Sequence, residues 1–201
     1  MKQVLVLAAA YLIGGIPFGY LLVRLIRGMD VRTMGSGNIG ATNVLRTAGR
    51  GLGILTLLLD IGKGLLAVWL ADRILEGSMA GMSLACLAVM AGHAYPLFLR
   101  FRGGKTVATF VGAFLYLTPV PLIATLLVFV LTIAASGYVS LGSVVAGVLF
   151  PLSVFLIEHP PGYVVVAAFV AGLFIVARHR SNLRRIRAGN EHVLSFGGKR
   201  R

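Results

Sequence analysis

The chain has 201 residues, of which 58% are hydrophobic and only 12% are charged, and its mean hydropathy is +0.91. Soluble domains carry about 25% charged residues, so this composition excludes a water-soluble globule and indicates a protein that a membrane solvates. The formal net charge of +13 would suit nucleic acid, but few aromatic residues accompany the basic runs and no nucleic-acid module is present.

Seven apolar stretches divide the chain, and we expect each to be a transmembrane helix of one polytopic domain covering residues 1–201. A span needs about 20 apolar residues, or fewer when it is short or tilted. The predicted spans cover residues 4–23, 51–71, 79–99, 107–117, 121–135, 138–157 and 162–177. The first is too long for the apolar core of a signal peptide, which has about 7–15 residues. The predicted fold class is therefore an all-α integral membrane protein with seven transmembrane helices.

The fourth and fifth spans depend on a division of one long apolar run. The run from Val107 to Ala135 is too long for one ordinary span, and Thr118-Pro119-Val120-Pro121 interrupts it. Prolines end or kink helices, so we divide the run there. Without that division the chain has six spans, and its two termini share a side of the membrane.

The distribution of positive charge favours seven spans with the N-terminus outside. Residues 24–50, 100–105 and 178–201 then face the cytoplasm, and they hold five, three and eight of the 19 lysines and arginines. Cytoplasmic loops of membrane proteins carry such an excess of positive charge. Six spans would place the last segment outside and weaken this bias, so we place the C-terminus in the cytoplasm.

The first cytoplasmic segment contains the pattern Gly35-x-Gly37-x-x-Gly40. It matches the dinucleotide fingerprint, but that fingerprint requires a preceding strand, whereas a membrane span precedes it here. Glycines leave backbone amides unshielded, and successive free amides bind anions. The nearby donors and cations are Ser36, Asn38, Thr42, Asn43, Arg46 and Arg50. We favour an anion site, because an ordinary loop needs neither this density of polar residues nor two arginines.

The second segment ends in Gly103-Gly104-Lys105-Thr106, which looks like the end of a P-loop. The complete pattern requires a glycine at the position of Leu99, so an ATPase is excluded. The segment nevertheless opens the fourth predicted helix, whose N-terminal amides attract phosphate. We assign Lys105 a ligand role there and interpret Arg100 as a topological anchor.

The third segment, residues 178–182, follows the last predicted span. Asn182 lies about one helical turn after His179, so the two share a polar face. His179 is a candidate general base, phosphate donor or interfacial residue. Ser143, near the inner end of the sixth span, carries a hydroxyl that either reaches a phosphate or bonds the backbone of its own helix.

Two charged residues and a histidine lie within or beside the apolar spans. Asp60 and Lys63 are three residues apart and share a helix face. Charges inside a span are costly and usually paired, so we interpret them as a structural pair that steadies the site from behind. His93, at the inner end of the third span, either lines the site or has a capping or interfacial role.

The residues required by several other enzyme classes are missing. The sequence has no zinc-ligand spacing, no Gly-x-Ser-x-Gly motif and no His-x₄-Asp pair. The inside-facing carboxylates are essentially Asp30 and Glu191, and a magnesium site needs carboxylates. We therefore expect no metal and no cofactor.

With these motifs, the chain resembles the bacterial acyl-phosphate:glycerol-3-phosphate acyltransferase family. The resemblance rests on residues 35–43, on residues 92–109, and on residues 178–182 with Asn190-Glu191, in matching order over essentially the whole chain. Asp60-x-x-Lys63 also fits the family pattern. The family usually has a glycine where this chain has Thr106.

The resemblance implies a small enzyme of the bacterial cytoplasmic membrane, with its active site on the cytoplasmic face. It would transfer a fatty acyl group from acyl phosphate to the first hydroxyl of glycerol 3-phosphate. The products would be lysophosphatidic acid and phosphate, in the first acylation of phospholipid biosynthesis. The implied partners are the two substrates, membrane lipids and the enzyme that forms the acyl phosphate. Acyl-CoA and acyl carrier protein would not serve as donors.

Both substrates carry a phosphate, so we expect two neighbouring anion sites. The mixed anhydride is already activated, and catalysis then needs alignment and oxyanion stabilisation rather than a nucleophile. The assigned ligands of glycerol 3-phosphate are Ser36, Arg46, Lys105, Ser143, His179 and Asn182, of which Ser36, Lys105 and His179 are the expected catalytic residues. Residues assigned to the acyl-phosphate head or to substrate binding in general are Gly37, Asn38, Gly40, Thr42, Asn43, Gly103 and Gly104. The base is either His179 or a phosphate oxygen of a substrate.

Two alternatives to an enzyme remain at this point. A small carrier for organic phosphates would explain the basic, glycine-rich inner mouth, but it predicts polar residues along a path through the bilayer. A scaffold of the lipid-synthesis machinery would not need three glycine-rich motifs.

Overall fold

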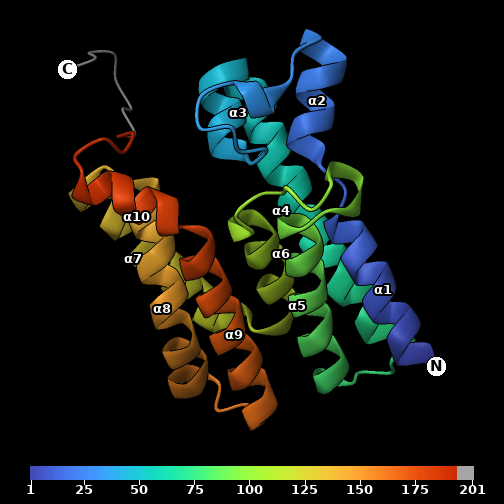
Figure 1. Cartoon of the computed structure of the whole chain (residues 1–201). Helices are drawn as coiled ribbons and strands as arrows, with labels where there is room; N and C mark the ends of the chain where they lie inside the picture. Colours follow the sequence, from blue (N-terminus) through green and yellow to red (C-terminus); the bar gives the residue numbers. More distant parts are fainter. Residues whose placement is uncertain (194–201) are drawn as a thin grey trace. The chain divides into compact units, whose positions relative to one another are not determined.

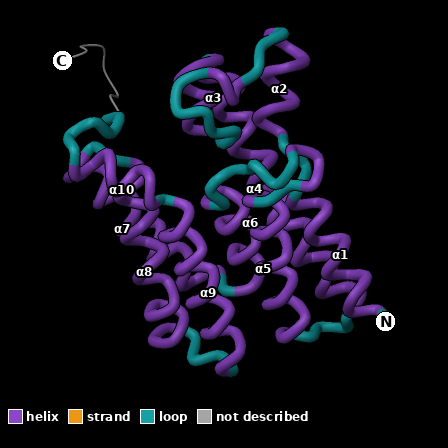
Figure 2. Tube along the Cα trace, in the orientation of Figure 1, coloured by secondary structure: helices purple, strands orange, loops and turns teal. Residues whose placement is uncertain are grey.

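The computed structural model describes residues 1–193, which are all-helical and contain no strand (Figures 1 and 2). The predicted all-α class is thereby confirmed. The helices are α1 (Lys2–Gly14), α2 (Phe18–Arg27), η1 (Val31–Thr33), α3 (Ala41–Ala48), α4 (Arg50–Ile74), α5 (Met79–Ala94), η2 (Leu97–Leu99), α6 (Val107–Leu117), α7 (Pro119–Ser136), α8 (Val139–Ile157), α9 (Gly162–Arg178) and α10 (Arg180–Arg187). Lys199, Arg200 and Arg201, which contribute to the predicted basic tail, lie outside the described residues.

Five helical stretches of the described chain are long and apolar enough to cross a membrane. They are Lys2–Arg27, Arg50–Ile74, Met79–Leu99, Pro119–Ser136 and Val139–Ile157, and α9 with α10 makes a sixth if this pair, bent by 51°, counts as one span. Helix α6 has 11 residues and is therefore about 16 Å long, shorter than the roughly 30 Å hydrocarbon core of a bilayer. The seven-span topology and the sides of the two termini stay predictions.

Prolines set two of the helix breaks. A helix break lies where we divided the long apolar run, because α6 ends at Leu117 and α7 begins at Pro119, two residues before the predicted start. The assignment of both helices as spans stays a prediction. The first predicted span is interrupted as well: α1 ends at Gly14, and α2 begins only after Pro17. Pro17 has no amide hydrogen to donate, so the helical hydrogen-bond ladder cannot continue through it.

The helices form two compact units. The first, Met1–Leu117, is organised around α4, which packs against α1, α3, α5 and α6. The second begins at Thr118, and in it α8 packs between α7 and α9 while α10 contacts α8 and α9.

Glycines bring α4 and α6 into backbone contact. A Cβ atom on Gly64 would lie 2.2 Å from the carbonyl oxygen of Thr109, and one on Gly112 would lie 1.8 Å from the carbonyl oxygen of Ile61. Small residues permit such close approach between membrane helices. This contact fixes the start of α6, and with it the residues just before α6, beside the middle of α4.

Candidate functional site

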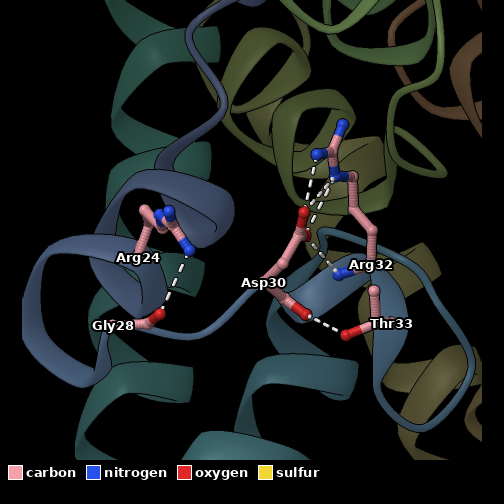
Figure 3. A network of polar contacts seen from close by, with 5 residues as sticks. All are labelled: Arg24, Gly28, Asp30, Arg32 and Thr33. Atoms are coloured by element: carbon pink, nitrogen blue, oxygen red, sulfur yellow. Dashed lines mark hydrogen bonds and ion pairs between the residues drawn. The ribbon is translucent and has the colours of Figure 1, made fainter.

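The segment before the first glycine pattern is held by a short polar network (Figure 3). Arg24 Nη1 donates to the carbonyl oxygen of Gly28 at 3.1 Å, where α2 ends. The guanidinium of Arg32 donates to both carboxylate oxygens of Asp30, with Nη2 at 2.6 Å from Oδ2. Thr33 Oγ1 donates to the Asp30 carbonyl oxygen at 2.9 Å. The hydrogen bond from Arg32 lowers the pKa of Asp30 to about 2, so the carboxylate is ionised at neutral pH and anchors η1.

Asn43, the third residue of α3, organises the glycine-rich loop. Its Nδ2 donates to the carbonyl oxygens of Val31, Met34 and Asn38, and its Oδ1 accepts from the backbone amide of Ser36 at 2.9 Å. Only 3% of Asn43 is exposed. The side chain predicted to bind substrate therefore bonds the loop itself, and we infer a positioning role for it.

Several amides of this loop are already bonded, which differs from the predicted nest of unshielded amides. The amide of Gly37 donates to the Met34 carbonyl oxygen at 2.9 Å, and that of Gly40 donates to Asn38 Oδ1 at 2.8 Å. The amide of Asn43 donates to the carbonyl oxygen of Gly40, and the amides of Ala41 and Thr42 at the start of α3 have no acceptor within the helix. The anion-attracting feature of this segment is therefore the N-terminus of α3, near the exposed side chains of Ser36 and Thr42, whereas the exposed Arg46 lies in the last turn of this helix.

The second predicted loop folds back onto the end of α5. The amides of Gly103 and Gly104 donate to the carbonyl oxygens of Ala94 and His93, at 3.1 and 3.0 Å. A Cβ atom on Gly104 would lie 2.0 Å from Nε2 of His93, so no larger residue fits there without displacing the ring. These two glycines permit close packing rather than supplying free amides, and the partly buried Lys105 and the first turn of α6 are the cationic features that remain.

Thr106, where the family usually has glycine, carries backbone strain. Its φ is +66°, in the left-handed region, which costs a non-glycine residue roughly 1–2 kcal/mol. Its side chain is buried, and among the described residues its hydroxyl has no hydrogen-bond partner. The left-handed backbone at this position explains why glycine suits it.

In the second unit, Glu191 connects helices α8 and α10. Its Oε1 accepts from Ser140 Oγ at 2.9 Å and from Asn182 Nδ2, and its Oε2 accepts from Arg185 Nε at 2.7 Å. Burial raises the pKa of this carboxyl, but the hydrogen bonds from Asn182, Arg185 and Ser140 outweigh it, so its pKa lies below the ordinary value. The sequence motifs include Glu191 without indicating this role, because its partners are known only once α8 and α10 are placed.

Replacing Glu191 with glutamine is expected to destabilise the protein by about 1–3 kcal/mol, because the neutral amide leaves donors of α8 and α10 without a charged acceptor. Since folding lowers the pKa of Glu191, its contribution to stability is present above the ordinary value of 4.5 and is lost as pH falls through the folded-state pKa. The unfolding temperature, measured in detergent, should therefore fall less between about pH 7 and pH 4 in Glu191→Gln than in the wild type.

The matched control is Glu76→Gln. The Glu76 side chain is 84% exposed and lies 3.7 Å from Lys2 Nζ, and exposed pairs of this kind contribute about 0–1 kcal/mol. Equal unfolding temperatures for Glu191→Gln and Glu76→Gln would contradict the anchoring role of Glu191.

His179 lies at the bend between α9 and α10. Its Nδ1 is 2.8 Å from the carbonyl oxygen of Ile175. A carbonyl only accepts hydrogen bonds, so Nδ1 carries the hydrogen, and in the neutral ring Nε2 then holds the lone pair. This tautomer allows Nε2 to accept a proton, or to donate to an anion once it is protonated.

Asn182 and Ser143 differ in what they offer a ligand. Asn182 is buried, its Nδ2 is directed to Glu191, and within residues 1–193 its Oδ1 has no hydrogen-bond partner. The hydroxyl of Ser143 donates to the Val139 carbonyl oxygen at 2.9 Å within α8. Of the two roles predicted for it, the structure shows the bond to the backbone of its own helix. The first unit thus contains Ser36, Arg46 and Lys105, and the second contains Ser143, His179 and Asn182.

His93 is the residue whose position the sequence left most open. It is 4% exposed, so it is not an interfacial side chain, and its ring contacts the backbone of Gly104. The sequence signal for a buried role was that His93 lies in the span that directly follows the one containing Asp60 and Lys63. Among residues 1–193, no group of three His, Cys, Asp or Glu side chains is arranged so that it could hold a metal ion.

Comparison with known proteins gives matches along nearly the entire chain. The family model described as glycerol-3-phosphate acyltransferase matches residues 4–189. A glycerol-3-phosphate acyltransferase of Desulforamulus reducens is 47% identical, and the match covers 95% of this chain and 94% of the relative. One from Geotalea daltonii is 44% identical, with coverage of 96% and 97%.

Two solved structures match the fold at 35% sequence identity. Both are crystal structures of PlsY (YgiH), an integral membrane glycerol 3-phosphate acyltransferase. The glycerol 3-phosphate form has a TM-score of 0.91, covering 97% of this chain and 96% of that chain. The lysophosphatidic acid form has a TM-score of 0.88, covering 96% and 95%.

Proposed function

This chain belongs to the glycerol-3-phosphate acyltransferase family, and from that premise we propose that its acyl donor is an acyl phosphate. The protein is an enzyme that acylates glycerol 3-phosphate and gives lysophosphatidic acid. The observation that carries this function is the structural match, over nearly the full length of both chains, to PlsY in its glycerol 3-phosphate form. The carrier and scaffold alternatives have no comparable support.

The donor proposal rests on the groups that the site offers. An acyl phosphate is already activated and carries an anionic leaving group, so the enzyme has to align the attacking hydroxyl and stabilise the developing oxyanion. Basic side chains and helix N-termini do this without metal or cofactor. A new ester bond forms between the sn-1 oxygen and the carbonyl carbon, and the bond from that carbon to the phosphate oxygen breaks, so that inorganic phosphate leaves. The hydroxyl proton passes to the base, which is either Nε2 of His179 or a phosphate oxygen of a substrate.

In the first unit we assign the two helix starts to phosphate. Ser36 with the N-terminus of α3, and Lys105 with the N-terminus of α6, supply donors and positive charge. Arg46, in the last turn of α3, adds a second cation to the first segment. Asn38 and Thr42 are assigned to the acyl-phosphate head and the oxyanion. The residues that contribute by shaping the two loops, because their polar groups are engaged within the protein, are Gly37, Gly40, Asn43, Gly103 and Gly104.

In the second unit we assign His179, Asn182 and Ser143 to glycerol 3-phosphate. The buried Oδ1 of Asn182 is an acceptor for a substrate hydroxyl. The tautomer of His179 is compatible with proton acceptance at Nε2, and a phosphate oxygen of a substrate is the other candidate base. Ser143 would have to exchange its bond to the Val139 carbonyl oxygen for one to substrate.

We extend the proposal to topology and location. Seven spans, with the N-terminus outside and the basic segments in the cytoplasm, agree with the positive-inside rule. We therefore propose that the enzyme lies in the bacterial cytoplasmic membrane with its active site on the cytoplasmic face. An enzyme that makes acyl phosphate, which is unstable in water, would then be its functional partner.

The test is an assay with purified protein in detergent. Acyl phosphate and glycerol 3-phosphate, supplied without metal, ATP or CoA, should give lysophosphatidic acid and inorganic phosphate in equal amounts. Acyl-CoA and acyl carrier protein loaded with the same chain should give no product. Product from acyl-CoA together with none from acyl phosphate would overturn the donor assignment.

A further inference from the structure

A buried ion pair lies in the middle of α4. Asp60 Oδ1 and Lys63 Nζ are 2.7 Å apart, and the two side chains are 3% and 2% exposed. Charged side chains inside a membrane-spanning segment are costly and usually serve a function. Neither group has a part in the acyl transfer derived above, so the pair needs an explanation of its own.

Lys63 extends the pair to the break between α1 and α2. Its Nζ donates to the carbonyl oxygen of Ile16 at 2.9 Å and lies 5.6 Å from the centre of the Phe18 ring. Ile16 is in the three-residue interruption that ends at Pro17. The ammonium group therefore joins α4 to the point where the first helix is broken.

Asp60 extends the pair in the other direction, to α5. Its Oδ1 lies 3.7 Å from Nδ1 of the buried His93. The opposite ring nitrogen of His93 faces Gly104, since a Cβ atom there would be 2.0 Å from Nε2. The His93 carbonyl oxygen also accepts the Gly104 amide at 3.0 Å. One residue thus contacts the glycine loop through both its ring and its backbone.

The close backbone contacts between α6 and α4, at Gly64 and Gly112, place the Gly103–Lys105 loop near the part of α4 that carries the ion pair. Gly64 contacts the Thr109 backbone, and Asp60 lies one helical turn before Gly64 on the same face of α4. Lys105 lies in the loop just before α6, whose first turn contains Thr109. The ion pair and His93 consequently form the support behind the loop at Gly103–Lys105.

We propose that Asp60, Lys63 and His93 are positioning residues that hold the Gly103–Lys105 loop, and with it the Lys105 ammonium, in the geometry that binds the substrate phosphate. The phosphate contact rests on the proposed function, whereas the support of the loop does not. The chain of contacts runs from the Ile16 carbonyl through Lys63, Asp60 and His93 to Gly104.

The experiment compares Asp60→Asn with the double variant Asp60→Asn/Lys63→Met, which leaves no unpaired charge in α4. The matched control is Tyr116→Phe. It removes the 2.7 Å hydrogen bond from Tyr116 Oη to Asp72 Oδ2, which joins the other ends of α6 and α4. Asp60→Glu, which keeps the carboxylate, tests rescue.

Two readouts are measured for each variant. Hydrogen–deuterium exchange of the Gly103 and Gly104 amides should be at least about tenfold faster in both Asp60 variants, with wild-type rates in Tyr116→Phe. The KM for glycerol 3-phosphate should rise on the order of tenfold, because small displacements of a binding group are costly. The kcat at saturation should fall less, and Asp60→Glu should recover part of the loss.

Exchange of these two amides that is unchanged in both Asp60 variants, or equally raised in Tyr116→Phe, would overturn the proposal. A wild-type protein that transfers no acyl group would instead refute the proposed function. The amide exchange would still decide whether the ion pair holds the loop, so the two failures are distinguishable.

Discussion

Replacing Lys105 with alanine is expected to reduce kcat/KM for glycerol 3-phosphate by about 30-fold or more, since truncating one partner of a charge pair that excludes water costs about 2–5 kcal/mol. The two glycines before Lys105 donate their amides to the end of α5, so they cannot replace the lost ammonium. The loss should appear chiefly in the KM for glycerol 3-phosphate, measured with acyl phosphate held at saturation.

Arg100→Asn is the matched control for this experiment. It removes a positive charge from the same loop. Arg100 has a φ of +52°, and asparagine tolerates this left-handed backbone. Near-wild-type kinetics are expected. Lys105→Arg should restore only part of the activity, because a planar guanidinium does not reproduce a compact ammonium. Equal losses in Arg100→Asn and Lys105→Ala would mean that the loop attracts anions only through its general charge.

Replacing His179 with alanine is expected to lower kcat by about 100-fold or more, in the range that general acid–base catalysis supplies. The hydrogen bond from Nδ1 to the Ile175 carbonyl oxygen fixes the ring and leaves the lone pair of the neutral imidazole on Nε2. Steady-state kinetics at saturating concentrations of both substrates measure this loss. Activity of His179→Ala above about one tenth of the wild type would exclude a role in the chemical step.

Two amide substitutions separate the functions of the two ring nitrogens. Asparagine at position 179 can reproduce the donor at Nδ1 but leaves nothing at Nε2. Glutamine can place a donor near Nε2 but cannot accept a proton there. If His179 is the base, His179→Gln should be as inactive as His179→Ala. If Nε2 only donates to phosphate, His179→Gln should retain more activity than either His179→Ala or His179→Asn.

The helices could be predicted from sequence wherever hydropathy and proline act together. Pro119 interrupts an apolar run that is too long for one span, so the break between α6 and α7 could be predicted there. Pro17 sits inside a run of ordinary length, where continuous hydropathy hides the break, although its missing amide was a usable signal. The span count is harder, because the 11 residues of α6 are apolar but short.

The candidate site was predictable in its residue types but not in its hydrogen bonds. Gly103, Gly104 and Asn43 are polar or flexible residues in basic loops, which suggested direct binding. Which acceptor each amide finds depends on where α5 ends and how α3 packs, and a sequence does not contain those distances. Asn43 and Glu191 consequently act as organisers of loops and helices, a role that only their hydrogen-bond partners identify.

The placement of Asp60 and Lys63 on the same helix bears on biogenesis. A single charge near the centre of a nascent span opposes its release from the translocon into lipid by about 2.5–3.5 kcal/mol. Here α4 brings both charges at once, three residues apart and 2.7 Å from each other, and α5 and α6 are synthesised only later. The nascent helix can therefore partition as a nearly neutral segment, and it acquires its contacts with His93 and the glycine loop after it is already in the bilayer.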